Sequence, residues 1–169
     1  MSGKSTFLRT KGINLALAYA GAPVCAKKMH CSLMDIYSSM QVSDNLEQNV
    51  STFYAELKRI KLIVDAVTAG KPIIFLIDEI FNGTNSKDRI LGAQAVIRNF
   101  NKLNTIGLVS THDLELSRLE TESPLIKNYH FTDKITGEKI SFDYRLNPGV
   151  SQSTNAMALM RIIGLLETE

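Results

Sequence analysis

The middle of the chain shows two kinds of hydrophobic spacing. From Phe53 to Val67, apolar residues recur at intervals of three and four, which predicts a long helix that starts near Ser51 and ends at Gly70. The run Ile73–Ile77 is apolar throughout, and a run of that length is typical of a strand buried on both faces of a parallel sheet. This segment therefore predicts a helix followed by a buried strand.

The same alternation continues toward the C-terminus. A helix over residues 86–102 and a second buried strand over 105–110 are expected next. Two strands over Leu125–Thr132 and Lys139–Leu146, around a turn at Thr136-Gly137, predict an antiparallel hairpin. An amphipathic helix is expected over Ser153–Leu166.

The first forty residues are less regular. A helix is expected from the first residues to near Gly21, and Leu33–Tyr37 is expected to form a strand or a turn. Strands that alternate with helices are typical of an α/β fold, with a mostly parallel sheet flanked by helices and the hairpin near the C-terminus.

Composition narrows the range of functions. The 169 residues carry a formal net charge of +2, and the basic residues are scattered, so no basic face for wrapping nucleic acid is predicted. No apolar run approaches the roughly 20 residues that span a bilayer, and we expect a cytoplasmic protein without a membrane partner. Cys25 and Cys31 lack the spacing of a metal site and are interpreted as reduced thiols.

The first residues contain a motif that binds phosphate. Gly3-Lys4-Ser5-Thr6 matches the second half of the pattern GxxxxGK[ST], in which backbone N–H groups and a helix N-terminus hold phosphate oxygens. Lys4 is expected to reach the β- and γ-phosphates of ATP, and the Ser5 hydroxyl is expected to bind Mg²⁺. A helix N-cap with a solvated lysine is the alternative interpretation of the tetrapeptide.

Polar residues end both predicted buried strands. Asp78 and Glu79 follow Ile77 directly, at the edge where α/β sheets bind ligands. Asp78 is expected to bind Mg²⁺, and Glu79 to activate a water molecule as general base. His112 follows the next strand, where an imidazole is placed to sense the γ-phosphate. Together with the phosphate loop, this order predicts an ATP-hydrolysing P-loop NTPase.

These motifs resemble the C-terminal ATPase domain of the MutS family, which is of the ATP-binding-cassette type. The segments that carry the resemblance span nearly the whole chain. They are Met1–Thr6 (the end of GPNMSGKST), Gly21–Ala26 (G-x-x-V-P-A), Ser51–Glu56 (S-T-F-x-x-E), Leu76–Thr84 (MDEIGRGT), Ser110–His112 (A-T-H) and Leu146–Ser151 (K-P-G-x-x-x-S).

The resemblance implies a head-to-tail homodimer driven by nucleotide. Met1 and Ser2 would belong with Gly3–Thr6 to the ATP-binding loop. Ser51 and Thr52, in the signature segment, would approach the γ-phosphate bound to the partner subunit, where a helix N-terminus offers N–H donors and partial positive charge. Asn85 would lie at the dimer seam, although an ordinary N-cap role for Ser51 is compatible with this picture.

The chain also departs from the family pattern. Asn82 replaces the usual arginine, Asn85–Asp88 replaces S-T-x-D, and the glycine before the signature serine is missing, which favours a divergent MutS-like branch. The phosphate loop lacks its first half and the strand before it. We therefore expect residues 1–169 to be a fragment of one ATPase domain that binds nucleotide poorly, an expectation that micromolar affinity for a labelled ATP analogue would contradict.

Other functions remain open at this point. A transporter-type or chromosome-maintenance ATPase would carry an L-S-G-G-Q signature, which the chain lacks, and a small-molecule kinase would need a lid with substrate-binding arginines. A dimerisation module without activity is the alternative that is not an enzyme. In the leading hypothesis, DNA contacts are supplied by domains outside this chain.

Overall fold

The computed structural model describes residues 3–40, 49–101, 105–136, 139–151, 160 and 164–165. The chain groups into two compact units, a larger one formed by Ser5–Ile126 and a smaller one formed by Met1–Lys4 with Lys127–Glu169. The expected cytoplasmic location is not tested by the fold, but no helix among the described residues is both long and apolar enough to cross a bilayer.

A parallel three-stranded sheet is the centre of the larger unit. Its strands, in the order β1-β2-β3, are Asp35–Ser39, Ile73–Ile77 and Ile106–Val109. Tyr37 pairs with Phe75, and Phe75 pairs with Gly107, so the three strands end close to the same edge. The parallel sheet that the sequence predicts is thus confirmed, with β1 shifted two residues from the expected Leu33–Tyr37.

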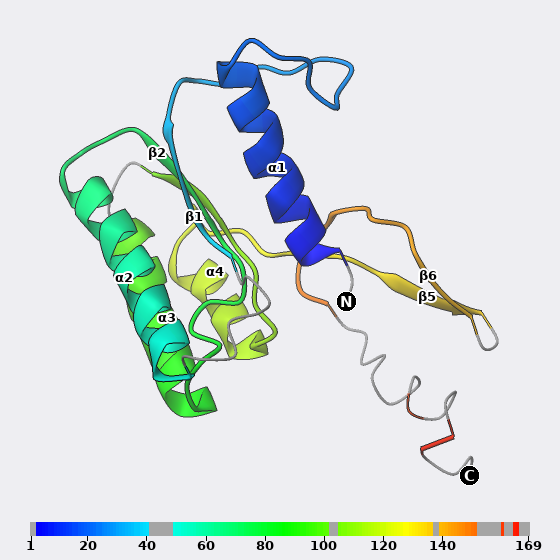
Figure 1. Ribbon diagram of the computed structural model, residues 1–169. Coiled ribbons are helices and arrows are strands. Elements are labelled where there is room, and N and C mark those ends of the chain that lie inside the picture. The colour runs from blue at the N-terminus through cyan, green and yellow to red at the C-terminus, as the bar shows by residue number, and fades with distance from the viewer. Residues whose placement is uncertain are drawn as a thin grey trace. The chain divides into compact units, whose positions relative to one another are not determined.

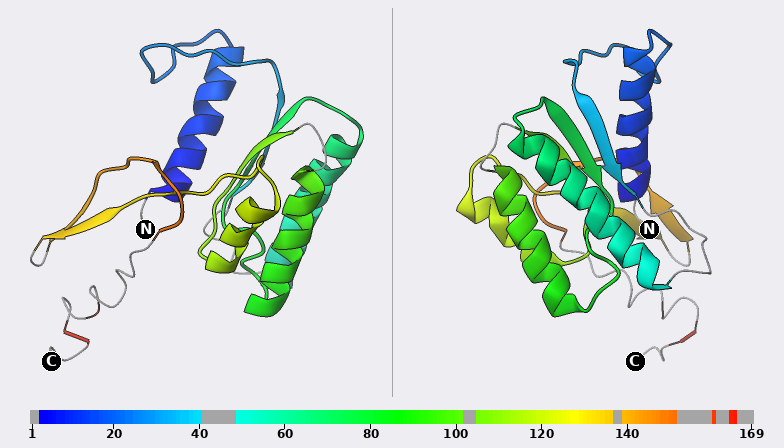
Figure 2. Two further views of the ribbon diagram at one scale, coloured as in Figure 1. Left: turned by 180° about the vertical axis from the view of Figure 1, so that it is seen from behind. Right: turned by 60° about the vertical axis from the view of Figure 1, so that its left-hand side comes forward.

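Helices cover both faces of this sheet (Figures 1 and 2). The two long helices α2 and α3 lie on one face, and α1 lies on the other. A short 3-10 helix, η1, leads directly into α4 after β3. The bounds are Lys4–Tyr19 for α1, Asn49–Thr68 for α2, Ser86–Asn101 for α3, Leu114–Arg118 for η1 and Leu119–Glu122 for α4.

The alternation of side-chain directions along β2 explains why helices pack on both faces of the sheet. Alternate side chains of a strand point to opposite faces. Ile73, Phe75 and Ile77 belong to the main core cluster with residues of α2 and α3. Leu76 points the other way, toward α1, where a Cβ on Gly12 would lie 2.9 Å from Leu76 Cδ1. The apolar run is therefore needed on both faces, as predicted.

The strand β3 differs from the sequence prediction of a fully buried strand. Ile106 is 55% exposed, and Gly107 is also exposed, because β3 lies at the edge of the described three-stranded sheet. At Gly107 the ring of Phe75 occupies the position that a side chain would take, since an added Cβ would lie 2.0 Å from ring atoms. Apolar character alone does not reveal whether a strand lies at the centre or at the edge.

The smaller unit holds two short antiparallel pairs. The strand β4 (Tyr129–His130) pairs with β7 (Asn147–Pro148), and β5 (Asp133–Thr136) pairs with β6 (Lys139–Phe142). The hairpin is confirmed, but its first arm is not the predicted Leu125–Thr132. Thr136 pairs with Lys139, and a connection this short requires the residues directly before it to form the first arm.

The helix expected over Ser153–Leu166 falls mostly outside the described residues. Gly137, in the expected hairpin turn, also lies outside them. Cys25 and Cys31, in the connection between α1 and β1, are free thiols with exposed side chains.

Candidate functional site

The carboxyl ends of the three parallel strands bring together three buried polar side chains. Ser39 ends β1, while Asp78 and Ser110 directly follow β2 and β3. The backbone N–H of Asp78 donates to the Ser39 carbonyl over 2.8 Å, and the Ser110 N–H donates to the carbonyl of Ile77, also over 2.8 Å. The ladder thus continues past the last strand residues and fixes the position of Asp78.

The Ser110 hydroxyl connects the two acidic residues after β2. It donates to Asp78 Oδ1 over 2.5 Å and accepts the backbone N–H of Glu79 over 3.0 Å. Asp78 is 7% exposed and Ser110 is 6% exposed, so this hydrogen bond is shielded from water. The sequence offered one signal for this role, a serine where the resembled A-T-H motif has alanine.

Glu79 and His112, which follow the ends of β2 and β3, lie side by side. His112 Nε2 is 2.8 Å from Glu79 Oε1, and the Asn82 side-chain amide donates to Glu79 Oε2 over 3.0 Å. Both carboxylate oxygens therefore have a nitrogen neighbour. A shallow hollow at this point is lined by Glu79, Ile80, Asn82, Arg89, Thr111, His112 and Asp113.

The backbone around Glu79 is in an uncommon conformation. Glu79 has a φ of 54° and Phe81 a φ of 59°, the left-handed region that non-glycine residues adopt at a cost. The Phe81 N–H donates to Glu56 Oε1 of α2 over 2.5 Å. Burial raises the pKa of the Glu56 carboxyl above its usual value, while this hydrogen bond and nearby Arg59 act in the opposite direction.

A bidentate ion pair fixes the segment after β3 to α3. Arg89 Nε and Nη2 each lie 2.7 Å from one carboxylate oxygen of Asp113. The hydrogen bonds from Arg89 hold the pKa of Asp113 below its usual value. Since Asp113 follows His112 directly, the ion pair restrains the backbone that carries the imidazole. No pattern along the chain pairs Arg89 with Asp113.

Asn85 has a clear local role at the start of α3. Its Oδ1 accepts the backbone N–H of Asp88 over 3.0 Å, and its amide donates to Asp88 Oδ2 over 2.6 Å. This is the geometry of a helix N-cap with a reciprocal contact to the third helical residue. The expected place of Asn85 at a dimer seam stays a prediction.

Part of the predicted phosphate loop is described. Gly3 has a φ of 94°, which favours glycine, and α1 begins at the next residue. Figure 2 shows that α1 runs along the sheet with its N-terminal end toward the edge where β1 and β2 end. Gly3 and Lys4 group with the smaller unit, so the convergence of Lys4 with Asp78 and His112 stays a prediction.

The remaining predicted site residues lie at or beyond the limits of the description. Met1 and Ser2 fall outside the described residues. The backbone of Ser51 and Thr52 is helical, in the first turn of α2, but their side chains are not described. Their proposed contact with a partner subunit therefore stays a prediction.

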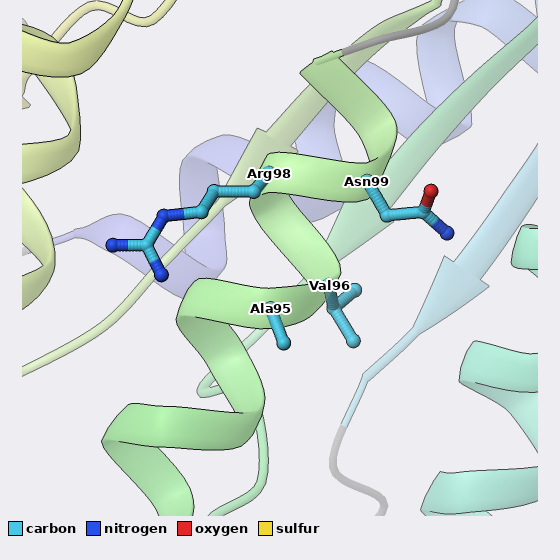
Figure 3. A pocket seen from close by; sticks show the side chains of 4 residues that line it. All are labelled: Ala95, Val96, Arg98 and Asn99. Atoms are coloured by element: carbon cyan, nitrogen blue, oxygen red, sulfur yellow. The ribbon is translucent and has the colours of Figure 1, made fainter.

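A second hollow lies near the C-terminal end of α3. Figure 3 shows the four side chains that line it, Ala95, Val96, Arg98 and Asn99, all of them from α3. The guanidinium of Arg98 makes a bidentate ion pair with Glu122, with distances of 2.7 and 2.8 Å. Because Glu122 engages the charge of Arg98 and every described side chain of the lining comes from α3, this hollow lacks the combination of acids and imidazole found at the strand ends.

Comparison with known proteins identifies the family of the chain. The pattern of the family described as MutS domain V matches residues 1–168. The chain belongs to the MutS family. It is 30% identical to the DNA mismatch repair protein MutS of Natronomonas pharaonis over 169 residues, which covers 99% of this chain and 20% of the relative.

Other MutS relatives show the same coverage. The DNA mismatch repair protein MutS of Thermus aquaticus is 32% identical over 98% of this chain and 20% of its own length. That of Thermotoga neapolitana is 34% identical over 89% of this chain and 19% of its own length. The chain thus spans about a fifth of the length of these MutS proteins.

Two residues at the site are departures from the MutS motifs quoted above. Asn82 contacts Glu79 at the position where the motif has arginine, and Ser110 contacts Asp78 at the position where it has alanine. In this MutS-family chain, Ser110 supplies a hydroxyl that alanine lacks, and Asn82 supplies a neutral amide in place of a guanidinium. The departures therefore lie at the candidate site itself.

Proposed function

We propose that this chain is the ATP-binding and ATP-hydrolysing domain of a MutS-like DNA mismatch repair or DNA-processing protein, a P-loop NTPase of the ATP-binding-cassette type. The observation that carries the proposal is the cluster of Asp78, Glu79, Ser110 and His112 at the carboxyl ends of parallel strands, in a chain of the MutS family. Parallel α/β sheets bind their ligands at this edge.

The residues fit a magnesium nucleotide. Asp78 and Ser5 would hold Mg²⁺, because carboxylate and hydroxyl oxygens are the ligands it prefers, and Mg²⁺ sites commonly take one carboxylate together with substrate phosphates. Bound Mg²⁺ would neutralise charge on the β- and γ-phosphate oxygens. Lys4 and the backbone N–H groups at the start of α1, with Met1, Ser2 and Gly3, would bind the phosphates, and Thr6 would complete the loop.

Glu79 and His112 would act on the attacking water. Glu79, at the end of a buried strand, takes a proton from water as general base. The imidazole of His112, 2.8 Å from the Glu79 carboxylate, orients that carboxylate and approaches the γ-phosphate. Because Asn82 and His112 each contact one Glu79 oxygen, the carboxylate is aligned before water arrives.

The acting form would be a homodimer. Ser51 and Thr52 at the N-terminus of α2 would approach the nucleotide of the partner subunit, and Asn85 would lie at the seam. DNA would be contacted by parts of the protein outside this chain, and the protein would act in the cytoplasm. Membership of the MutS family supports this arrangement.

The test is phosphate release from Mg²⁺-ATP by the full-length protein without an added acceptor. Glu79→Ala is expected to lower turnover about 100-fold or more while ATP binding, followed with a fluorescent analogue, stays within about threefold. Glu115→Ala, which removes an exposed acid of η1, serves as the control and keeps turnover. Turnover of Glu79→Ala within about twofold of the parent would contradict the proposed base.

A further inference from the structure

A contact between α2 and the segment after β2 is not accounted for by the proposed chemistry. Glu56 lies in the second turn of α2, five residues after Ser51, and its carboxylate accepts the backbone N–H of Phe81 over 2.5 Å. Phe81 is 6% exposed and lies two residues after Glu79. The contact therefore joins the start of the helix that carries the signature segment to the segment that carries the general base.

Close packing surrounds this hydrogen bond. The rings of Phe53 and Phe81 meet edge to face, with centroids 6.3 Å apart and planes at 73°. A Cβ on Gly83 would lie 2.9 Å from Phe53 Cβ, and one on Gly92 of α3 would lie 3.1 Å from Phe81 Cε2. Phe81 is thus enclosed by α2 and α3, and the segment has little room to move independently of α2.

We propose that Glu56 is a positioning residue that couples the N-terminal end of α2 to the Glu79 carboxylate through the backbone N–H of Phe81. The inference rests on the proposed ATPase function. It adds a physical link between the two ends of the composite site, because the start of α2 serves the partner's nucleotide and Glu79 serves the nucleotide of its own subunit.

The backbone of residues 79–81 makes this link effective. Glu79 and Phe81 both have positive φ, a conformation that persists only where surrounding contacts determine it. The Glu79 N–H is held by Ser110, with the side-chain oxygen at 3.0 Å, and the Phe81 N–H is held by Glu56. Removing the second contact frees one end of the segment, and the contacts of Asn82 and His112 then hold the Glu79 carboxylate on a backbone that is less restrained.

The experiment compares three variants of the full-length protein. Glu56→Ala removes the acceptor, Glu56→Gln keeps an oxygen at the same place, and Asp65→Ala removes an exposed acid of the same helix that pairs with Lys61. Glu56→Ala is expected to lower kcat for ATP hydrolysis about tenfold or more with KM changed less than about threefold. Glu56→Gln and Asp65→Ala are expected to stay within about threefold of the parent.

Hydrogen exchange gives a readout that does not depend on hydrolysis. The Phe81 amide is expected to exchange roughly tenfold faster in Glu56→Ala than in the parent, and at the parental rate in Glu56→Gln. Thermal unfolding of each variant establishes that the overall fold is kept. A loss of kcat in Glu56→Gln equal to that in Glu56→Ala would overturn the role of the acceptor oxygen.

The outcomes separate this inference from the proposed function. Normal hydrolysis by the parent, its loss in Glu79→Ala and parental values of kcat and Phe81 exchange in Glu56→Ala would overturn the coupling alone. A parent that hydrolyses no ATP would overturn the proposed function and, with it, the catalytic part of the coupling. The exchange measurement would still decide whether Glu56 holds the Phe81 amide.

Discussion

At the scale of single residues, the hydroxyl of Ser110 connects the two acidic residues that follow β2. It donates to Asp78 and accepts from the Glu79 backbone, and both Asp78 and Ser110 are buried. A buried carboxylate that loses a hydrogen-bond donor keeps the cost of its removal from water. The stability of the strand ends should therefore depend on this one oxygen atom.

Ser110→Ala is expected to lower the free energy of unfolding by about 1–3 kcal/mol, because it leaves Asp78 Oδ1 and the Glu79 N–H without this partner. Urea-induced unfolding measures the change. Ser38→Ala, at an exposed serine of β1, is the matched control and should stay within about 0.5 kcal/mol of the parent. Equal effects of the two substitutions would show that the buried hydroxyl adds nothing.

Three of the residue roles proposed from the sequence concern positions that follow strand ends, and a local pattern made them predictable. Asp78, Glu79 and His112 were found because a buried apolar strand followed by a polar residue is a local pattern. The contacts of Glu56 with Phe81 and of Arg89 with Asp113 join residues 25 and 24 positions apart. Spacing along the chain carries no sign of such pairs, since only the packing of helices on the sheet creates them.

At the scale of elements, the ion pair between Arg89 and Asp113 joins α3 to the segment after β3. The two side chains are 23% and 13% exposed, whereas the Arg98–Glu122 pair between α3 and α4 is 47% and 44% exposed. Solvent screens the second pair more strongly. The first pair should therefore contribute more to holding its two elements together.

The ion pair between Arg89 and Asp113 predicts that the stability of the folded chain depends on pH. The pKa of Asp113 is lower in the folded chain than in the unfolded one, so its stabilising effect is complete above the ordinary aspartate pKa of about 4 and is lost as pH falls through the folded value. Asp113→Asn should lower Tm by about 2–4 °C at pH 7. The difference in Tm between the variant and the parent should shrink below about pH 4.

Thermal unfolding between pH 7 and pH 3 checks this expectation. Glu122→Gln, which removes the more exposed pair, is the control and should change Tm less at pH 7. A difference between parent and Asp113→Asn that grows toward acid pH would contradict the assigned sign.

The pairing of β2 with β3 requires a glycine. Gly107 lies opposite Phe75, whose ring occupies the place of a side chain at 107 and packs on Phe100 with centroids 4.4 Å apart. Gly107→Ala should lower the free energy of unfolding by about 1–3 kcal/mol, because the ring must leave its position. Chemical denaturation measures the loss.

The combination with Phe75→Leu makes the Gly107 test specific. If the clash with the ring is the cause, the double variant should be more stable than the sum of the single effects predicts, by about 0.5 kcal/mol or more. Additive effects would show that the backbone preference of glycine, and not the ring, determines residue 107.

At the scale of the whole molecule, the elements from α2 to β3 could be predicted, since each of them has an apolar period or run, whereas β1 was expected only as a strand or a turn. The smaller unit could not be predicted to the same degree. Its strands are two to four residues long, too short for an alternating pattern to define their ends, and the predicted arm Leu125–Thr132 was misplaced for this reason.

The two exposed thiols of the molecule have a practical consequence. Cys25 and Cys31 are the only cysteines of the chain, and both lie in the connection between α1 and β1, away from the strand ends. Maleimide dyes or nitroxide spin labels will attach there without any engineered cysteine. Fluorescence or electron paramagnetic resonance can then follow how this connection responds when ATP is added, with the chemistry of the strand ends left untouched.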